Sequence, residues 1–334
     1  MFEEEVRRAL DYVAGGVSVR IVGGPGSGKS TVLQPIAAGL EKAGVTVYSL
    51  SGSRLLNETP FAGIGALGLE GRGQENGPLG VANVLAERLA RRGARAIVVD
   101  DIDELDKESV AVIDIVQRRT ERPLVVTMDD APLYSMASVF TPAQWPEATI
   151  RLCPLRYDQV NKLLAQTLGS PPDVDLTTAV LMKSGGNPRL VVRIAQSAEL
   201  SEQLVLLDGQ WSMSGHTLSN EYLQSTVQEL LHGLSADERT TLHTLSVVGA
   251  RPLGPLMQIV EADILDSLEM RGLVALIEGS GGAMWVSVSP HIVVDHFRDL
   301  QVRSSRRVLA DRSNREIDPP ARQLQSPSPE LLSD

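Results

Sequence analysis

Short apolar runs alternate with amphipathic stretches through the first half of this 334-residue chain. Five runs rich in β-branched residues predict strands, at Val17–Val22, Val45–Leu50, Ala96–Val99, Leu124–Thr127 and Thr149–Cys153. Patterns with helical spacing lie between them, at Gly28–Ala43, Leu79–Arg92, Asp106–Arg119 and, more weakly, near Tyr134–Val139. Continuously apolar strands separated by helices are typical of a parallel sheet covered on both faces. The fold class is therefore α/β, with ligands expected at the carboxyl ends of the strands.

The pattern changes after Pro154, where helical spacing replaces the strands. Helices are expected at Arg156–Leu168, Leu176–Ser184, Pro188–Leu200, Glu221–Gly233, Ala236–Val247 and Asp263–Arg271. Two strand-like pieces, Leu273–Glu278 and Met284–Val288, follow around a glycine-rich turn, and helices before such a hairpin indicate a winged-helix-like unit. The segment Ala262–Arg271, with the preceding Glu261, carries four acids against one base. A helix that faces phosphates needs the opposite balance, so we expect this unit to serve packing rather than DNA binding.

Two segments interrupt this regular organisation. Ser51–Gly80 is rich in glycine and carries two prolines, which predicts a surface excursion with one short helix near Phe61–Leu67. A mobile sensor of nucleotide or partner and a poorly ordered insertion both fit that composition. From Gln301 onward the chain becomes basic and then polar, with four prolines and few apolar residues, so a disordered tail is expected.

The glycine-rich sequence between the first strand and the first helix carries the strongest chemistry. It reads Gly23, Gly24, Pro25, Gly26, Ser27, Gly28, Lys29, Ser30 and Thr31, which fits G-x-x-x-x-G-K-S/T. Glycines let successive backbone N–H groups surround a phosphate, and the helix that follows directs its positive end at the same anion. Lys29 would reach the β- and γ-phosphates, and the Ser30 hydroxyl would ligate Mg²⁺. The alternative is a glycine-rich turn without a ligand.

A second motif lies at the end of the third predicted strand, where Asp100 and Asp101 follow an apolar run. Beside a phosphate-binding loop, Asp100 can hold the Mg²⁺ shell and Asp101 can orient or activate the attacking water. Acids that simply follow a strand and begin a helix are the alternative, and Asp103 and Asp106 are candidate caps of that kind. Together the two motifs predict Mg²⁺-dependent binding of a nucleoside triphosphate, with Lys29 and Asp101 as the candidate catalytic residues.

Composition and charge predict a soluble globular protein that does not bind polyanions non-specifically. The hydrophobic share of 43% is that of a soluble globular protein, and no apolar run approaches the length of a membrane span. A net charge of −11 argues against non-specific binding of polyanions. Neither a signal peptide nor a transit peptide is apparent in Met1–Arg20, so a cytoplasmic location is expected. The single cysteine, Cys153, excludes an internal disulfide and is expected to be a small buried residue at a strand end.

These motifs resemble the STAND class of P-loop NTPases, in particular the ATPase module of large LuxR-type (maltose-regulator-like) transcriptional activators. The resembling sequences are GGPGSGKST, AIVVDD, LNETPFAGIGAL, LCPLRYDQVNKLLAQTLG, SGGNPRLVVRIA and WVSVSPHIVVDHFRDL, spread over Gly16–Leu300. The resemblance implies a P-loop domain over residues 1–153, a helical lid over 154–215, a winged-helix-like domain over 216–300 and a polar tail over 301–334. It also implies that Pro188 opens the lid helix over the base and that His291 touches the β-phosphate.

The chain departs from this family at two points. The family carries an arginine after the fourth strand as a candidate γ-phosphate sensor, whereas this chain has Asp129 and Asp130 there. Two acids repel a triphosphate, so slow hydrolysis and a weak preference for ATP are expected unless Arg118 or Arg119 substitutes. No convincing DNA-recognition helix is present, so DNA is expected to be reached only indirectly or through an effector domain that this chain does not show.

The residues and the resemblance together favour a nucleotide-controlled signalling switch, closed with ADP and self-associating with Mg·ATP. Its partners are expected to be nucleotide, further copies of the chain, and a regulatory protein or small-molecule signal, with no membrane. One alternative is a motor or loader ATPase of the AAA+ type, which requires continuous turnover. Another is a catalytically inactive scaffold in which nucleotide is only structural.

Overall fold

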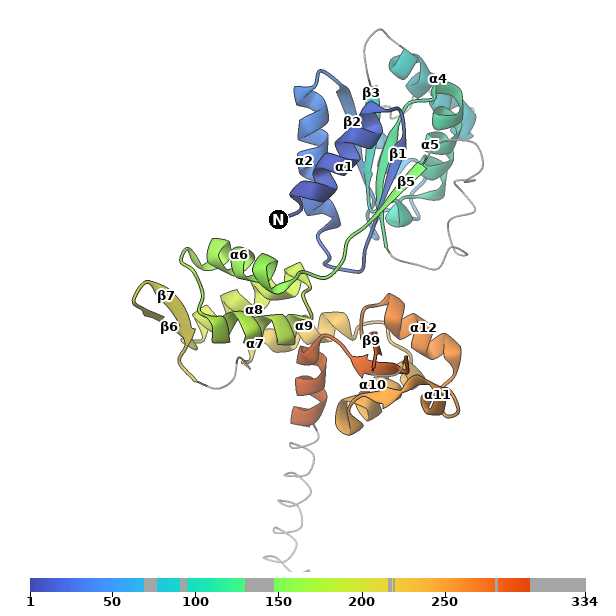
Figure 1. The fold of residues 1–334 in the computed structure, drawn as a ribbon. Coiled ribbons are helices and arrows are strands. Elements are labelled where there is room, and N and C mark those ends of the chain that lie inside the picture. Colours follow the sequence, from blue (N-terminus) through green and yellow to red (C-terminus); the bar gives the residue numbers. More distant parts are fainter. Residues whose placement is uncertain are drawn as a thin grey trace, which may run out of the picture.

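The computed structural model describes residues 1–68, 77–90, 95–129, 147–215, 218, 220–279 and 282–300. Its upper part in Figure 1 is built on a five-stranded parallel sheet, which confirms the expected fold class. The strands are β1 (Ser18–Val22), β2 (Thr46–Ser51), β3 (Arg95–Asp100), β4 (Leu124–Met128) and β5 (Glu147–Arg151). Their order is β2-β3-β4-β1-β5, so β4 lies between the strand before the glycine-rich loop and the strand before the acidic pair.

Helices cover both faces of this sheet (Figure 1). They are α1 (Glu3–Ala14), α2 (Lys29–Lys42), α3 (Ala62–Gly65), α4 (Gly77–Ala90), a 3-10 turn η2 (Ile102–Glu104) and α5 (Lys107–Thr120). Side chains of a strand point alternately to opposite faces, and the cores follow that alternation. Val98 packs in the core on the α1 and α2 side, whereas its neighbours Ile97 and Val99 pack in the core on the α4 and α5 side.

Below the sheet lies a group of three helices, α6 (Tyr157–Leu168), α7 (Val174–Ser184) and α8 (Pro188–Leu200). We refer to α6, α7 and α8 as the three-helix group. A hairpin of β6 (Leu204–Leu207) and β7 (Gln210–Met213) follows it. This hairpin was not predicted, although Asp208 and Gly209 at its turn, both with positive φ, are a typical hairpin signal.

The last described part contains α9 (Tyr222–Leu230), α10 (Ala236–Val248), β8 (Arg251–Pro252), α11 (Leu253–Leu256), α12 (Ala262–Met270), β9 (Val274–Glu278) and β10 (Met284–Val288). The predicted hairpin is confirmed as β9 and β10, which pair antiparallel. The short strand β8 extends it to a three-stranded sheet of order β8-β10-β9. A helix over residues 291–300 ends the described chain.

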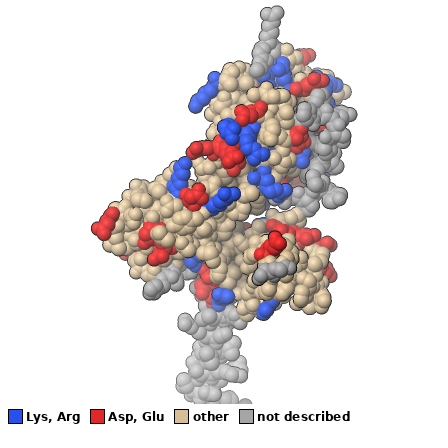
Figure 2. Space-filling model, in the orientation of Figure 1, with Lys and Arg blue, Asp and Glu red and all other residues tan. Residues whose placement is uncertain are grey.

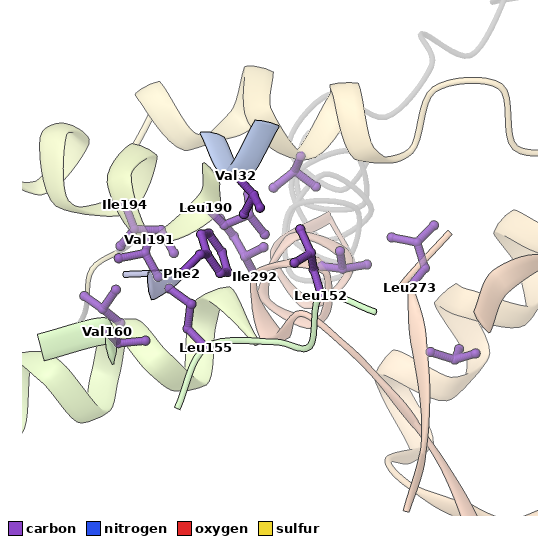
Figure 3. Close-up of a cluster of buried hydrophobic side chains, with 14 of the residues drawn as sticks. Phe2, Val32, Leu152, Leu155, Val160, Leu190, Val191, Ile194, Leu273 and Ile292 are labelled. Carbon is purple, nitrogen blue, oxygen red and sulfur yellow. The ribbon is translucent and has the colours of Figure 1, made fainter. Parts of the chain in front are cut away.

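One hydrophobic core joins the sheet to the parts below it. Phe2, which is 6% exposed, lies among Val32 of α2, Leu152 and Leu155 after β5, and Leu190 of α8 (Figure 3). The same cluster continues through the three-helix group to the α9–β10 part. The glycine-rich loop therefore lies on a continuous core rather than on an isolated sheet.

The remaining outcomes concern sequence expectations outside the site. Helix α1 was not predicted, and Cys153 is exposed rather than buried, because it follows the end of β5 in the connection to α6. The weak helix near Tyr134–Val139 and the tail from residue 301 lie outside the described residues. None of the described helices has the length and apolar character that crossing a bilayer requires.

Candidate functional site

The loop from Gly23 to Gly28 connects β1 to α2, as the motif predicted. Gly26 and Gly28 have φ of 75° and 98°, values that residues with a Cβ rarely adopt. Space is also limited there. A Cβ on Gly26 would lie 2.9 Å from Asn187 Oδ1, and one on Gly28 would lie 2.8 Å from Phe2 Cε2. These glycines are therefore required by the loop conformation and by the side chains packed against it.

The lysine of the motif is buried in an ion pair. The Lys29 ammonium donates to the Gly23 carbonyl at 3.1 Å and to Asp129 Oδ1 at 2.6 Å. The Lys29 side chain is 8% exposed, and that of Asp129 is 36% exposed. Ser30 and Thr31 of the same motif are exposed at the beginning of α2. Asp129, which follows β4, thus contacts the lysine of the loop directly.

The acidic pair occupies the carboxyl edge of the sheet, two strands from the loop. The Thr127 hydroxyl donates to Asp100 Oδ1 at 2.6 Å and accepts the backbone N–H of Asp101 at 2.7 Å. Asp101 has φ of 47°, and Gly52 at the end of β2 lies against it, since a Cβ on Gly52 would be 2.1 Å from the Asp101 carbonyl oxygen. The backbone here is tightly fixed, which holds the two carboxylates in place.

Two carboxyl groups at this edge have perturbed acidity. Burial, followed by the charge of Asp100, raises the pKa of Asp101, although Lys29 opposes the shift. Burial also raises the pKa of Asp103, and the charge of Asp129 adds to the effect. Asp103 Oδ2 accepts the backbone N–H of Asp129 at 3.0 Å, while its buried Oδ1 lacks a hydrogen-bond partner in the described part of the chain. A concentration of negative charge is therefore held close to one lysine.

The two candidate caps have different outcomes. Asp106 caps α5 by accepting the backbone N–H of Ser109, as predicted. It also accepts the backbone N–H groups of Phe61 and Gly63, which ties the short helix α3 to α5. Asp103 does not cap a helix but binds the backbone of Asp129.

The beginning of α8 contacts the glycine-rich loop. Asn187 caps α8 and donates from Nδ2 to the Pro25 carbonyl at 2.8 Å, and the backbone N–H of Arg189 donates to the Gly26 carbonyl at 3.3 Å. Pro188 is the first residue of α8 and is buried. The structure thus brings Pro188 and the loop together, although they are far apart in the sequence.

A cleft of about 670 Å³ lies beside this contact. Gly24, Pro25 and Ser27 line one side of it, Pro188 contributes from α8, and Arg271 lies among the residues contributed by the α9–β10 part. This volume is in the range of sites for small molecules and cofactors. Lys29 and Asp100 are not among the residues that line the cleft.

The remaining candidate residues lie elsewhere. His291 begins the helix over 291–300, pairs with Asp295 at 3.6 Å and is not among the residues that line the cleft. Arg118 pairs with Asp114, and Arg119 binds the side chain of Asn83. Both arginines are in the last turn of α5, whose Gln117 contacts Ser18 at the first residue of β1. Because the loop follows the other end of β1, neither arginine replaces the missing sensor in this structure.

The loop has features that fit a phosphate group. The Ser27 hydroxyl is buried and lacks a hydrogen-bond partner among the described residues, and the loop presents its backbone at the start of α2. Anions bind favourably at such helix beginnings. No group of three or more His, Cys, Asp or Glu side chains in the described part is arranged to hold a metal ion. That finding is compatible with Mg²⁺, which usually binds one or two protein groups together with phosphate oxygens.

Comparison with known proteins agrees with this geometry. Residues 19–150 match the AAA family. The family is described as "ATPase family associated with various cellular activities (AAA)", and the match spans β1 to β5. A search of curated proteins finds no matching sequence.

The chain is also similar to solved structures at low identity. A Thermotoga maritima RuvB variant is 16% identical over 90% of this chain and 93% of its own, with a TM-score of 0.45. AMPPCP-bound DnaA from Aquifex aeolicus is 15% identical over 81% of this chain and 75% of its own, with a TM-score of 0.43. The family match thus supports an AAA-type P-loop ATPase fold for the sheet, while the finer resemblance to STAND regulators stays a hypothesis.

Sequence reasoning missed two parts of the site. The pair of Lys29 and Asp129 joins residues 100 positions apart, and only the placement of β4 beside β1 brings them together. The second part is Phe2, which lies at the beginning of α1 and packs against Gly28. The apolar positions Val6, Ala9, Leu10 and Val13 have the spacing of a helix and could have predicted α1. The charged residues between those positions made this helical pattern difficult to recognise.

Proposed function

We propose that this protein is a nucleotide-controlled conformational switch that binds ADP or Mg·ATP at the Gly23–Thr31 loop and hydrolyses ATP slowly. The observation that carries the proposal is the direct contact between the loop and the beginning of α8. Any ligand that rearranges the carbonyl groups of Pro25 or Gly26 also changes the contacts of Asn187 and Arg189. Occupancy of the loop is thereby coupled to the position of the three-helix group, which acts as the lid.

The chain's own residues supply distinct parts of this site. Backbone N–H groups of the loop and the Lys29 ammonium would bind phosphate oxygens. Ser30 and Asp100 would hold Mg²⁺, which supplies charge neutralisation on the phosphates when bound. Asp101 is suited to orient water, and its raised pKa reflects burial beside Asp100. Pro188 stays the candidate lid contact, and His291, which directly follows the cleft-lining Ser289 and Pro290, stays a candidate contact of the β-phosphate.

The proposed organisation keeps the division into residues 1–153, 154–215, 216–300 and 301–334. The three-stranded sheet of β8, β10 and β9, with α12 between β8 and β9 in the chain, supports a winged-helix-like unit in the third of these segments. On the face drawn in Figure 2, basic side chains lie beside acidic ones rather than forming one continuous basic patch. This arrangement favours partners of the protein class, including further copies of the chain, over direct binding of DNA.

The energy needed for switching is within reach of such a site. Moving a two-state equilibrium from mostly closed to mostly open needs about 5.5 kcal/mol of differential affinity. Each charge-assisted hydrogen bond to a γ-phosphate contributes about 1.5–3 kcal/mol. Several such bonds suffice, although the missing sensor arginine removes one source of them.

Hydrogen exchange of the nucleotide-stripped full chain with ADP or with β,γ-methylene-ATP, beside light scattering, tests the switch. We expect ADP to preserve protection at the beginning of α8, and the triphosphate analogue to reduce that protection and raise the molecular mass. Asn187→Ala should speed exchange there by about fivefold, the equivalent of one hydrogen bond. Asn161→Ala is the matched control, since Asn161 bonds Thr177 within the three-helix group.

Two results would exclude the switch. Protection and mass that are the same with both nucleotides would mean that occupancy is not transmitted to the lid. Rapid, sustained ATP turnover by an oligomer would instead identify a motor or loader ATPase of the AAA+ type.

A further inference from the structure

Asp129 binds the lysine that a phosphate-binding loop needs for its ligand. Its Oδ1 lies 2.6 Å from Lys29 Nζ, and the lysine side chain is almost fully buried. A charge-assisted contact of this length is among the stronger hydrogen bonds in proteins, and here the carboxylate is partly exposed while the ammonium is buried. The chain itself therefore supplies an anionic partner for this lysine.

The position of Asp129 is fixed by its surroundings. Asp129 directly follows β4, the strand between β1 and β3. The backbone N–H of Asp129 donates to Asp103 Oδ2 at 3.0 Å. The nearby cation Arg54 pairs with Glu104 at 2.6 Å instead. Within the described residues, Lys29 is the partner in the ion pair of Asp129. Withdrawing Lys29 would leave the Asp129 carboxylate facing the ligand without that compensation.

We propose that Asp129 is a positioning and selectivity residue that weakens nucleotide binding and favours a diphosphate over a triphosphate. The inference rests on the proposed function, since it concerns the same loop. Any phosphate that binds Lys29 must share the ammonium with the carboxylate or compete with it. A triphosphate places additional negative charge near the lysine, and like charges at a partly buried site repel more strongly than they do in bulk water. Asp129 therefore acts as an internal anion that sets the ratio of the two affinities.

Calorimetric titration of the nucleotide-stripped full chain with ADP and with β,γ-methylene-ATP, with and without Mg²⁺, tests this role. Asp129→Asn keeps the size of the side chain and an acceptor oxygen while removing the charge. We expect it to tighten ADP binding by about threefold and binding of the triphosphate analogue by about thirtyfold. Asp129→Ser, a second neutral variant, should act in the same direction if the asparagine variant folds poorly.

Two further variants separate charge from structure. Asp129→Glu keeps the charge and should leave the affinity ratio near that of the wild type. Asp114→Asn removes a partly buried carboxylate whose partner, Arg118, is in the last turn of α5, and should change neither affinity. A merely structural role for Asp129 would alter stability without changing the ratio.

The outcomes distinguish this inference from the proposed function. If the wild type binds both nucleotides and neither neutral variant changes the affinity ratio, the role of Asp129 is wrong and the nucleotide site stands. If the wild type binds neither nucleotide with or without Mg²⁺ and the neutral variants bind neither as well, both proposals fail. Binding that appears only in the neutral variants would support the inference in its strongest form.

Discussion

Carboxyl groups at the carboxyl edge of the sheet and carboxyl groups that cap helices have pKa values shifted in opposite directions. Burial and neighbouring acids raise the pKa of Asp101 and of Asp103. Burial acts in the same direction on Asp106 and Glu238, but donated hydrogen bonds outweigh it and lower the pKa of both. For Asp106 the donors include the backbone of Gly63 and Ser109, and for Glu238 the main donor is the Ser267 hydroxyl.

The difference shows where the fold tolerates unfavourable charge. Asp106 and Glu238 serve the helices α5 and α10 and contribute stability at neutral pH. Asp101 and Asp103 cost stability at neutral pH, and they lie within the small region that surrounds Lys29. Electrostatic strain of this kind is typical of sites that bind a charged ligand. The raised pKa values of these two carboxyl groups agree with the proposed ligand site at the carboxyl edge.

The largest change in the free energy of unfolding is expected from Gly52→Ala, because this substitution disturbs the backbone that fixes Asp101. The new Cβ would meet the Asp101 carbonyl oxygen at 2.1 Å, so the edge must shift. We expect unfolding free energy to fall by more than about 3 kcal/mol, as in severe overpacking. Urea denaturation measures the loss. Gly254→Ala is the control, because a Cβ there meets nothing within 4 Å, and an equal loss in both variants would refute the explanation.

A slightly smaller loss is expected when Asp106 is removed. Asp106→Ala would leave the backbone N–H groups of Phe61, Gly63 and Ser109 without their acceptor. We expect a loss of about 2–3 kcal/mol in the free energy of unfolding at pH 7. The pKa of Asp106 is lowered, so its contribution is present above the ordinary value of 3.8 and is lost as the pH falls below it. Denaturation curves between pH 7 and pH 3 should therefore converge for wild type and variant.

The smallest change in stability is expected at the carboxyl edge, where removing a charge should stabilise the protein rather than destabilise it. Because the pKa values of Asp101 and Asp103 are raised, the folded state binds protons better there, and the ionised groups destabilise it at pH 7. Asp101→Asn should raise the Tm of the nucleotide-free protein by about 1–2 °C. The gain should shrink as the pH falls through the raised pKa, as thermal melts at several pH values would show. A lowered Tm at pH 7 would remove the contrast between the two sets of acids.

Much of the fold followed from local patterns in the sequence. Apolar runs identified all five strands of the parallel sheet, and Pro188 and Asn187 marked the start of α8. The hairpin of β6 and β7 was missed because its Asp208–Gly209 signal was not weighed against the helices on either side. The exposure of Cys153 was mispredicted, since the sequence does not show that the chain leaves the sheet directly after Arg151.

The chemistry of the site was only partly predictable. The motif located Lys29, and the strand ending in Asp100 and Asp101 located the acidic edge. Contacts that depend on tertiary structure were not accessible, because the order of β1, β4 and β3 brings Asp129 to Lys29. The contact of Asn187 with Pro25 likewise depends on how the three-helix group packs against the loop. Sequence patterns specify elements, whereas pairings between them depend on packing.

The central claim, that this chain holds a nucleotide at the Gly23–Thr31 loop, is tested most directly by identifying what the purified protein carries. Freshly purified wild type and Lys29→Ala are denatured, and the released nucleotide is identified by chromatography. We expect stoichiometric ADP from the wild type and none from the variant. No nucleotide from either protein, together with no affinity of the wild type for added ADP or Mg·ATP, would contradict the account.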